Sequence, residues 1–267
     1  MQESLFKAGS VSLGDISVRR IGLGSNRLTD TPENAKLLRE AIALGINFID
    51  TADVYTFGAS EETLGRHLTP YPEDLVIATK GGVVRGQPPD GSPAYLRQAV
   101  DASLRRLRAE HLALYQLHRP DARIPIEESV GCLKELQAAG KIRRIGLSNV
   151  SVEQLESCRK IAPIVSIQNE YSLAQREQDP MIAYCEREGI AFLPYFPLAA
   201  GSKQDLLKQI ATRHQATVTQ VTLAWLLSRS PVMLPIPGTL SIAHLRENVA
   251  AGALVLDPRE LTALTEA

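Results

Sequence analysis

Short, mostly apolar runs alternate along the chain with helical stretches, and turns rich in Gly, Pro and Asp separate the two. Apolar runs of this length are typical of strands buried on both faces of a parallel sheet. The starts of eight such runs lie 22 to 42 residues apart. The runs are Ile21–Leu23, Ile46–Ile49, Leu75–Ala78, Leu112–Leu117, Ile142–Leu147, Ile164–Ile167, Ile190–Leu193 and Val232–Leu234. This alternation predicts βαβ units.

The helical stretches have recognisable ends. Thr31 can cap a first helix with Pro32 at its first position, and Gly45 supplies a left-handed stop. Other helices are expected to open at Ser92 with Pro93, Ser151 with Glu153 and Asp179 with Pro180, and to end at Gly140 and Gly189.

Two further elements frame the eight units. Apolar positions alternate from residue 11 to residue 18 around Gly14-Asp15, which predicts a hairpin able to cover the lower end of a barrel. Asp257-Pro258 starts a last short helix. Eight βα units in about 250 residues is the size of a TIM barrel. The predicted fold class is therefore α/β, a (β/α)8 TIM barrel with an N-terminal β-hairpin and a C-terminal helix; a doubly wound open sheet is the alternative.

Composition narrows the class of protein. The 267 residues contain no long polar linker, so we expect a single domain over residues 1–267. Lys and Arg number 29 against 30 Asp and Glu, which argues against a nucleic-acid binder. No apolar run approaches the roughly 18 residues of a membrane span, and Met1–Ser10 lacks a signal-peptide core. We therefore expect a cytoplasmic protein without a membrane partner.

Metal and disulfide chemistry find little support in the sequence. Cys132, Cys158 and Cys185 are isolated within helical stretches, and an odd, scattered set is not a disulfide framework or a zinc site. The chain has no HExxH motif or second histidine at ligand spacing. We expect three buried cysteines and no metal.

Polar residues gather where the predicted strands end, which is where barrel enzymes place their active sites. Asp50 and Tyr55 follow the second run, Lys80 the third and His118 the fourth. An ammonium beside a phenol lowers the pKa of the phenol, and a carboxylate keeps the ammonium charged. His118 could orient a carbonyl oxygen or relay a proton. The four together favour protonation of an oxygen that gains negative charge.

Each of the four residues also has a plainer interpretation. Asp50 and Lys80 could form a structural ion pair, Tyr55 could be a rim aromatic, and His118 could be a turn residue. Their position at neighbouring strand ends favours the catalytic interpretation.

The segment Asn47–Tyr55, NFIDTADVY, resembles the first signature of the aldo-keto reductase family, and the resemblance covers nearly the whole chain. Lys80 and His118 complete the family's catalytic tetrad with Asp50 and Tyr55. The resemblance implies reduction of aldehydes and ketones to alcohols, with hydride delivered by a nicotinamide and a proton delivered by Tyr55.

Other segments resemble the cofactor-binding regions of this family. The resemblance implies that Ser148, Asn149 and Gln168 hold the carboxamide and that Tyr195 stacks on the nicotinamide ring. The full set of implied cofactor residues is Ser148, Asn149, Gln168, Tyr195, Phe196, Pro197, Leu198, Ile236, Gly238, Thr239, His244, Glu247 and Asn248. A dinucleotide fingerprint starting at Gly22 fails because Arg27 occupies its third glycine position.

The adenosine-phosphate segment departs from the family pattern. Gly238 and His244 stand where many members carry Lys or Arg to neutralise a 2′-phosphate. Thr239 and Arg246 could contribute instead, so NADPH is the expected cofactor and NADH the alternative. Glu247 and Asn248 match adenine-binding positions, and a solvated helix face is the alternative for them.

Substrate choice depends on the loops at the rim, which are short in this chain. Phe196 replaces the small polar residue common after the stacking tyrosine. Gln168–Arg176 and Gly238–Asn248 resemble most closely a bacterial group with pyridoxal reductases, which suggests pyridoxal or another aromatic aldehyde as the small-molecule partner. We expect a monomer.

Two other functions remain as alternatives. One is an NADPH-binding sensor or regulatory subunit on the same barrel, without turnover. The other is a Schiff-base lyase with Lys80 as nucleophile, which Asp50 disfavours because a carboxylate raises the pKa of a lysine.

Overall fold

The computed structural model describes residues 7–266, so the first six residues of the segment Met1–Ser10 lie outside the described part. Within it, parallel strands follow one another around a single sheet in chain order. The strands are β3 (Leu23–Gly24), β4 (Phe48–Asp50), β5 (Val76–Gly81), β6 (Leu114–Leu117), β7 (Ile145–Ser148), β8 (Ile164–Glu170) and β9 (Ala191–Tyr195). Each one overlaps one of the first seven predicted runs, although β5 and β8 extend further and include Lys80 and Gln168.

The eighth predicted run, which the structure describes in full, closes the ring without being a regular strand. On one side, the backbone of Phe192 in β9 donates to Val232 O (2.9 Å) and accepts from Leu234 N (2.8 Å). On the other side, Gly22 N donates to Pro235 O (3.0 Å). Pro235 and the proline two residues later have no N–H, so they cannot extend the ladder. The predicted barrel is confirmed, with its last strand reduced to isolated pairings.

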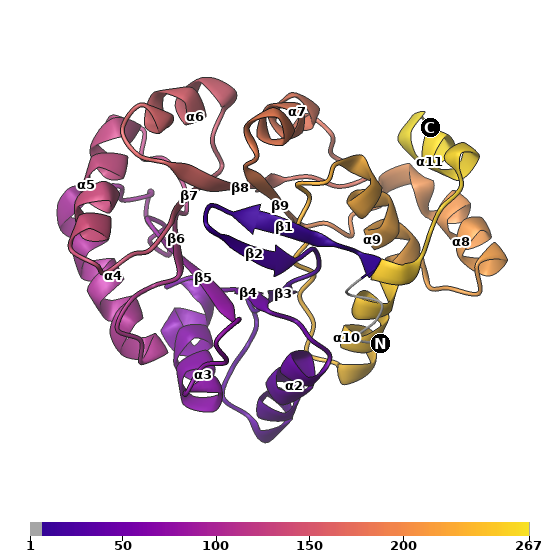
Figure 1. The fold of residues 1–267 in the computed structure, drawn as a ribbon, viewed down its shortest axis with the longest axis horizontal. Helices are drawn as coiled ribbons and strands as arrows, with labels where there is room; N and C mark the ends of the chain where they lie inside the picture. Colours follow the sequence, from indigo (N-terminus) through magenta and orange to yellow (C-terminus); the bar gives the residue numbers. More distant parts are fainter. Residues whose placement is uncertain (1–6, 267) are drawn as a thin grey trace.

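Helices surround the strands on the outside of the ring (Figure 1). They are α2 (Pro32–Ala43), α3 (Ala59–Leu68), α4 (Pro93–Leu107), α5 (Ile126–Ala138), α6 (Val152–Arg159), α7 (Asp179–Glu188), α8 (Gln204–Arg213), α9 (Val218–Arg229), α10 (Ile242–Ala250) and α11 (Pro258–Glu266), with short 3-10 turns η1 (Tyr55–Gly58), η2 (Gly201–Lys203) and η3 (Ala251–Ala253). This closed arrangement excludes the doubly wound alternative. In the described part, no helix is both long and apolar enough to cross a membrane.

Most helix ends form as the sequence predicts. The side chains of Thr31, Ser92 and Ser151 each accept a backbone N–H in the first turn of their helices. The predicted stops have positive φ at Gly45, Gly140 and Gly189. Asp179 was expected to cap α7, but it is the first helical residue, and its carboxylate accepts a hydrogen bond from the Tyr171 hydroxyl (2.6 Å) instead.

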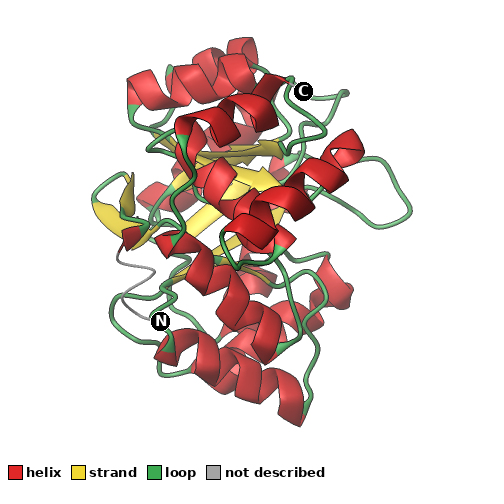
Figure 2. Cartoon of the chain, turned by 90° about the vertical axis from the view of Figure 1, so that its right-hand side faces the viewer, coloured by secondary structure: helices red, strands yellow, loops and turns green. Residues whose placement is uncertain are grey.

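The predicted hairpin consists of β1 (Ser10–Leu13) and β2 (Ile16–Arg19), which pair antiparallel. It lies across the centre of the ring in Figure 1 and projects from one end of it in Figure 2. Arg144, which precedes β7, donates to the Asp15 carboxylate at the hairpin turn (2.7 Å). The hairpin therefore covers the amino ends of the strands, and the carboxyl ends remain available for a site.

The three cysteines are free and buried in α5, α6 and α7, as predicted. Burial raises the pKa of Cys158 and of Cys185 to about 12. These thiols therefore pack as small apolar side chains.

Two helical glycines provide a test of the packing. A methyl group on Gly65 of α3 would lie 2.3 Å from the Arg106 carbonyl oxygen, whereas one on Gly131 of α5 would meet nothing within 4 Å. We expect Gly131→Ala to raise the free energy of unfolding by up to about 1 kcal/mol and Gly65→Ala to lower it by about 1–3 kcal/mol. Urea denaturation measures both. Equal stabilisation by the two variants would contradict the close approach of α3 to α4.

Candidate active site

A cavity of about 1100 Å³ opens at the carboxyl ends of the strands. This volume lies at the upper end of the range for small-molecule and cofactor sites. Asp50, Tyr55 and His118 line it together, although Asp50 ends β4, Tyr55 lies in the turn after it and His118 follows β6.

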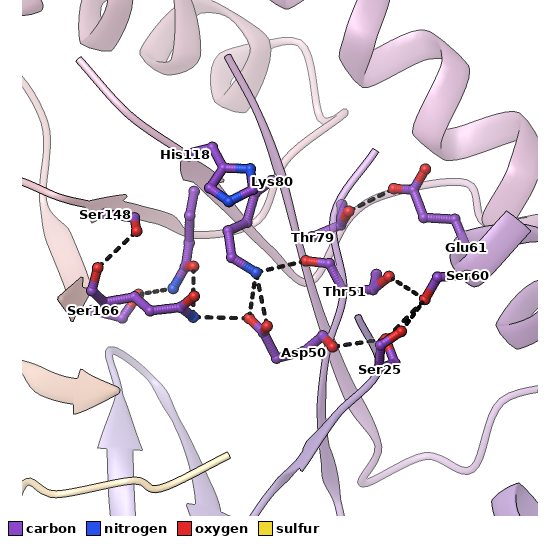
Figure 3. Close-up of polar contacts among 12 residues, drawn as sticks. Ser25, Asp50, Thr51, Ser60, Glu61, Thr79, Lys80, His118, Ser148 and Ser166 are labelled. Atoms are coloured by element: carbon purple, nitrogen blue, oxygen red, sulfur yellow. Dashed lines mark hydrogen bonds and ion pairs between the residues drawn. The ribbon is translucent and has the colours of Figure 1, made fainter. Parts of the chain in front are cut away.

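A buried ion pair lies at the floor of the site (Figure 3). Lys80 on β5 is fully buried, and its Nζ donates to both carboxylate oxygens of Asp50 on β4 (2.8 and 2.7 Å) and to Thr51 O (2.7 Å). Burial is the largest single effect and disfavours the lysine cation, but Asp50 and Tyr55 together outweigh it and raise the pKa of Lys80. The lysine is therefore a fixed cation.

A chain of side-chain amides supports this pair. Gln168 Nε2 donates to Asp50 Oδ1 (2.9 Å) and to Gln116 Oε1 (3.2 Å), and Gln116 Nε2 donates to Ser166 Oγ (3.0 Å). The network fixes the orientation of the carboxylate. Gln116 was not among the predicted site residues. An amide within a buried apolar strand was the available signal, because buried polar groups need partners.

Tyr55 lies close to the lysine cation and to His118. Lys80 Nζ is 5.0 Å from the centroid of the Tyr55 ring, and the His118 ring lies edge-on to it at 5.9 Å. Burial outweighs the lysine, and the pKa of Tyr55 is raised. Lys80 lowers the pKa of the phenol, as the sequence predicts, but the opposing effect of burial is larger. The phenol is protonated at neutral pH, as a proton donor must be.

His118 is a neutral imidazole in this environment. Burial, followed by the positive charges of Lys80 and Arg119, lowers the pKa of His118 to about 3. Its Nδ1 is buried and has no hydrogen-bond partner among the described residues. A neutral imidazole can donate one hydrogen bond to a carbonyl oxygen. This environment disfavours the imidazolium that the proton-relay alternative requires.

The turn that carries Tyr55 has an unusual backbone. Thr56, Phe57 and Gly58 all have positive φ, at 47°, 58° and 86°. Non-glycine residues rarely adopt this region, and such strain concentrates at functional sites. Thr56 Oγ1 donates to Leu28 O (3.0 Å), which ties the turn to the loop after β3.

Several predicted cofactor residues form another wall of the cavity and are hydrogen-bonded to one another. Ser148 Oγ donates to Gln168 O (2.7 Å) and accepts from Asn149 Nδ2 (3.0 Å). The Tyr195 hydroxyl donates to Asn149 Oδ1 (2.7 Å), and Phe196 packs edge-on against the Tyr195 ring at 5.3 Å. A partly exposed aromatic ring held beside fixed amides fits a flat ring that carries a carboxamide.

Most of the predicted site residues line this cavity. They are Asp50, Tyr55, His118, Ser148, Asn149, Gln168, Tyr195, Phe196, Pro197, Leu198, Ile236 and Gly238. Lys80 lies behind Asp50, and Thr239 lines a small neighbouring crevice beside Leu240.

The three predicted residues on α10 lie outside the lining of the cavity. His244 is exposed and Glu247 is half-buried, whereas Asn248 is only 4% exposed, so the solvated-face alternative is wrong for Asn248. Arg246 donates to Glu40 on α2 (2.8 Å). Its guanidinium is therefore already engaged.

The cavity also has lining residues that the sequence analysis gave no role. Val83, Gln87 and Pro89 come from the connection between β5 and α4, and Arg119 and Glu170 follow β6 and end β8. Nothing in the local pattern showed which loop residues turn toward the cavity.

A second carboxyl group lies just outside the site. Asp53 N donates to Lys80 O (3.0 Å), and the Tyr95 hydroxyl donates to Asp53 Oδ2 (3.2 Å). Asp53 Oδ1 is buried without a partner among the described residues. Burial, with a smaller effect of Glu61, raises the pKa of Asp53 to about 7.

Residues 20–267 match the Aldo/keto reductase family. The chain belongs to this family. The protein is thus an oxidoreductase, and the family predicted from the sequence is confirmed.

Individual relatives match this aldo/keto reductase over nearly its whole length. Pyridoxine 4-dehydrogenase of Escherichia coli is 42% identical over 279 residues, which cover 96% of this chain and 97% of that enzyme. An uncharacterized oxidoreductase of Schizosaccharomyces pombe is 40% identical over 276 residues, with 97% and 90% covered. The structure resembles that of an aldo/keto reductase from Klebsiella pneumoniae in complex with NADP and acetate, with a TM-score of 0.85, 30% identity, and 96% and 93% covered.

The environment of Asp53 gives a prediction about stability. Its pKa is raised from 3.8 to about 7 in the folded protein, so ionisation costs the folded state stability as pH rises from about 4 to 7. Asp53→Asn removes this cost. Relative to the unsubstituted protein, the variant should gain about 3 kcal/mol between pH 4.5 and pH 7.5.

Urea denaturation at the two pH values measures this gain. Asp205→Asn, at an exposed position on α8, is the control and should show no such change. A difference between Asp53→Asn and the unsubstituted protein that stays constant with pH would contradict the assigned pKa.

Proposed function

We propose that this aldo/keto reductase uses NADPH to reduce an aldehyde or ketone to the alcohol, with Tyr55 as the proton donor. The main support is that Tyr55 lies next to both Lys80 and His118 on the floor of the cavity. Side-chain amides and aromatic rings line another wall of the same cavity. When bound, the cofactor supplies the hydride.

Each catalytic side chain has a role that follows from its charge. Protonated Tyr55 delivers its proton to the carbonyl oxygen as that oxygen gains negative charge. The Lys80 cation stabilises the phenolate left behind, and Asp50 holds the cation in place. Neutral His118 donates a hydrogen bond to the same oxygen and orients the carbonyl group.

The alternative of a Schiff-base lyase conflicts with the geometry of Lys80. Its Nζ donates to three oxygen atoms within 2.8 Å, and its pKa is raised. A nucleophilic lysine needs a lowered pKa and a free lone pair.

NADPH is the proposed cofactor, and the Klebsiella pneumoniae relative with bound NADP supports it. Ser148, Asn149, Gln168 and Tyr195 would hold the nicotinamide end. Gly238 and His244 replace the Lys or Arg that many family members use to neutralise the 2′-phosphate of the cofactor. In this chain, Thr239 and the backbone amides at the start of α10 would bind that phosphate instead. The preference over NADH is correspondingly modest.

An aromatic aldehyde such as pyridoxal is the proposed substrate. The 42% identity to pyridoxine 4-dehydrogenase of Escherichia coli supports this choice. Phe196 is 65% exposed and lines the cavity, so its ring can contact an aromatic substrate. A monomeric state and a cytoplasmic location stay predictions.

The proton donor can be tested by removing one hydroxyl group. Tyr55→Phe should lower kcat for pyridoxal reduction at least about 100-fold, the size of a general-acid contribution, and leave the Kd for NADPH within about twofold. Tyr71→Phe is the matched control, because its hydroxyl bonds the backbone of Leu107 outside the cavity. NADPH oxidation in the steady state and fluorescence titration give the two readouts. Unchanged turnover in Tyr55→Phe would refute the assigned acid.

The cofactor preference can be tested at the exposed α10 position. His244→Arg should lower the Kd for NADPH about fivefold, since one exposed charge pair contributes about 1 kcal/mol, and leave the Kd for NADH unchanged. Arg246→Gln should leave both values unchanged, because Arg246 binds Glu40. Fluorescence titration with each dinucleotide measures the four constants. A selective loss of NADPH affinity in Arg246→Gln would place the phosphate contact at Arg246 instead.

A further inference from the structure

An unpaired guanidinium lies on the wall of the cavity next to the reacting groups. Arg119 follows His118 directly, lines the cavity and is exposed. It forms no ion pair with any residue between positions 7 and 266, whereas Arg123 on the same loop donates to Asp121 (2.8 Å). Arg119 is therefore available to a ligand.

The charge of Arg119 reaches both sides of the expected reaction centre. After burial and Lys80, it is the third cause that lowers the pKa of His118. It also opposes the rise that burial causes in the pKa of Tyr195. Arg119 also lines the same cavity as His118, its chain neighbour, and Tyr195, so the guanidinium faces the space between the imidazole and the proposed nicotinamide wall.

Other charges on the wall do not neutralise this cation. Asp50 is occupied by Lys80. Glu170 is exposed, contributes to the raised pKa of Tyr195, and forms no ion pair in the described part of the chain. The cavity's other arginine, Arg27, lines it beside Gly238, at the end proposed for the cofactor phosphates.

We propose that Arg119 selects carbonyl substrates that carry an anionic oxygen group, and that an aromatic aldehyde with a ring carboxylate or phenolate is the preferred class. The planar guanidinium can donate two parallel hydrogen bonds to a carboxylate. Pyridoxal belongs to this class, because it has a ring hydroxyl that ionises next to its aldehyde. This proposal rests on the proposed carbonyl reduction, and it adds the residue that would recognise the anionic group of the substrate.

Two aldehydes of nearly equal shape provide the test. 4-Carboxybenzaldehyde and 4-nitrobenzaldehyde carry flat groups of similar size, but only the carboxylate is charged. Arg119→Gln should raise KM for the carboxylate substrate about tenfold or more, since a charge-assisted hydrogen bond contributes about 1.5–3 kcal/mol. The same variant should leave kcat, and both constants for the nitro substrate, within about threefold.

Two further variants separate charge from structure. Arg119→Lys should recover part of the lost preference, because it restores the charge without the planar fork. Arg123→Gln removes a guanidinium from the same loop and should leave both substrates unaffected. An equal loss on the two aldehydes in Arg119→Gln, or no loss on either, would overturn the proposal.

A binding measurement distinguishes failure of the proposed role of Arg119 from failure of the proposed carbonyl reduction. If the unsubstituted protein oxidises NADPH with neither aldehyde, carbonyl reduction of this class is refuted. Binding of 4-(hydroxymethyl)benzoate and of 4-nitrobenzyl alcohol, measured by calorimetry in the presence of NADP, then tests Arg119 by itself. A selective loss of benzoate affinity in Arg119→Gln supports the role, and equal affinities in the two proteins reject it.

Discussion

The buried ion pair between Asp50 and Lys80 is the interaction on which the rest of the site depends. Taking both charges out of water is costly, and only close geometry with further hydrogen bonds makes such a pair tolerable. The lysine has three acceptor contacts, and Gln168 donates to the carboxylate. Because the partners come from adjacent parallel strands, the barrel itself holds the cation beneath Tyr55.

Burial, followed by the fixed charge of Lys80, determines the protonation states of the neighbouring groups. His118 cannot also become a cation in the same buried space, so it is neutral. Tyr55 keeps its proton because burial outweighs the lysine. The arrangement combines a fixed cation, a protonated phenol and a neutral imidazole, which are the states that the proposed carbonyl reduction requires. On the wall of the same cavity, Arg119 adds a second positive charge beside these groups.

Local sequence signals determined much of the barrel. Continuous apolar runs specified the regular strands, and Thr31 shows a helix start set by residues within one turn. The last strand differs, because Pro235 and its neighbouring proline cannot donate hydrogen bonds to a ladder. The eighth run was apolar enough to be recognised in the sequence. Its pairing, however, depends on the tertiary fold, which brings it between β9 and the segment that begins β3.

The sequence by itself determined the strand order, most of the helix ends and many of the residues that share the rim, because each follows from short-range chemistry and from the regular recurrence of βα units. Only the tertiary structure decided the direction of the Tyr55 pKa, the amide bridge through Gln116 and the engagement of Arg246 by Glu40. These depend on burial and on contacts between residues far apart in the chain. Arg246 and Glu40, for example, are separated by 206 positions, and no local pattern indicates that they meet.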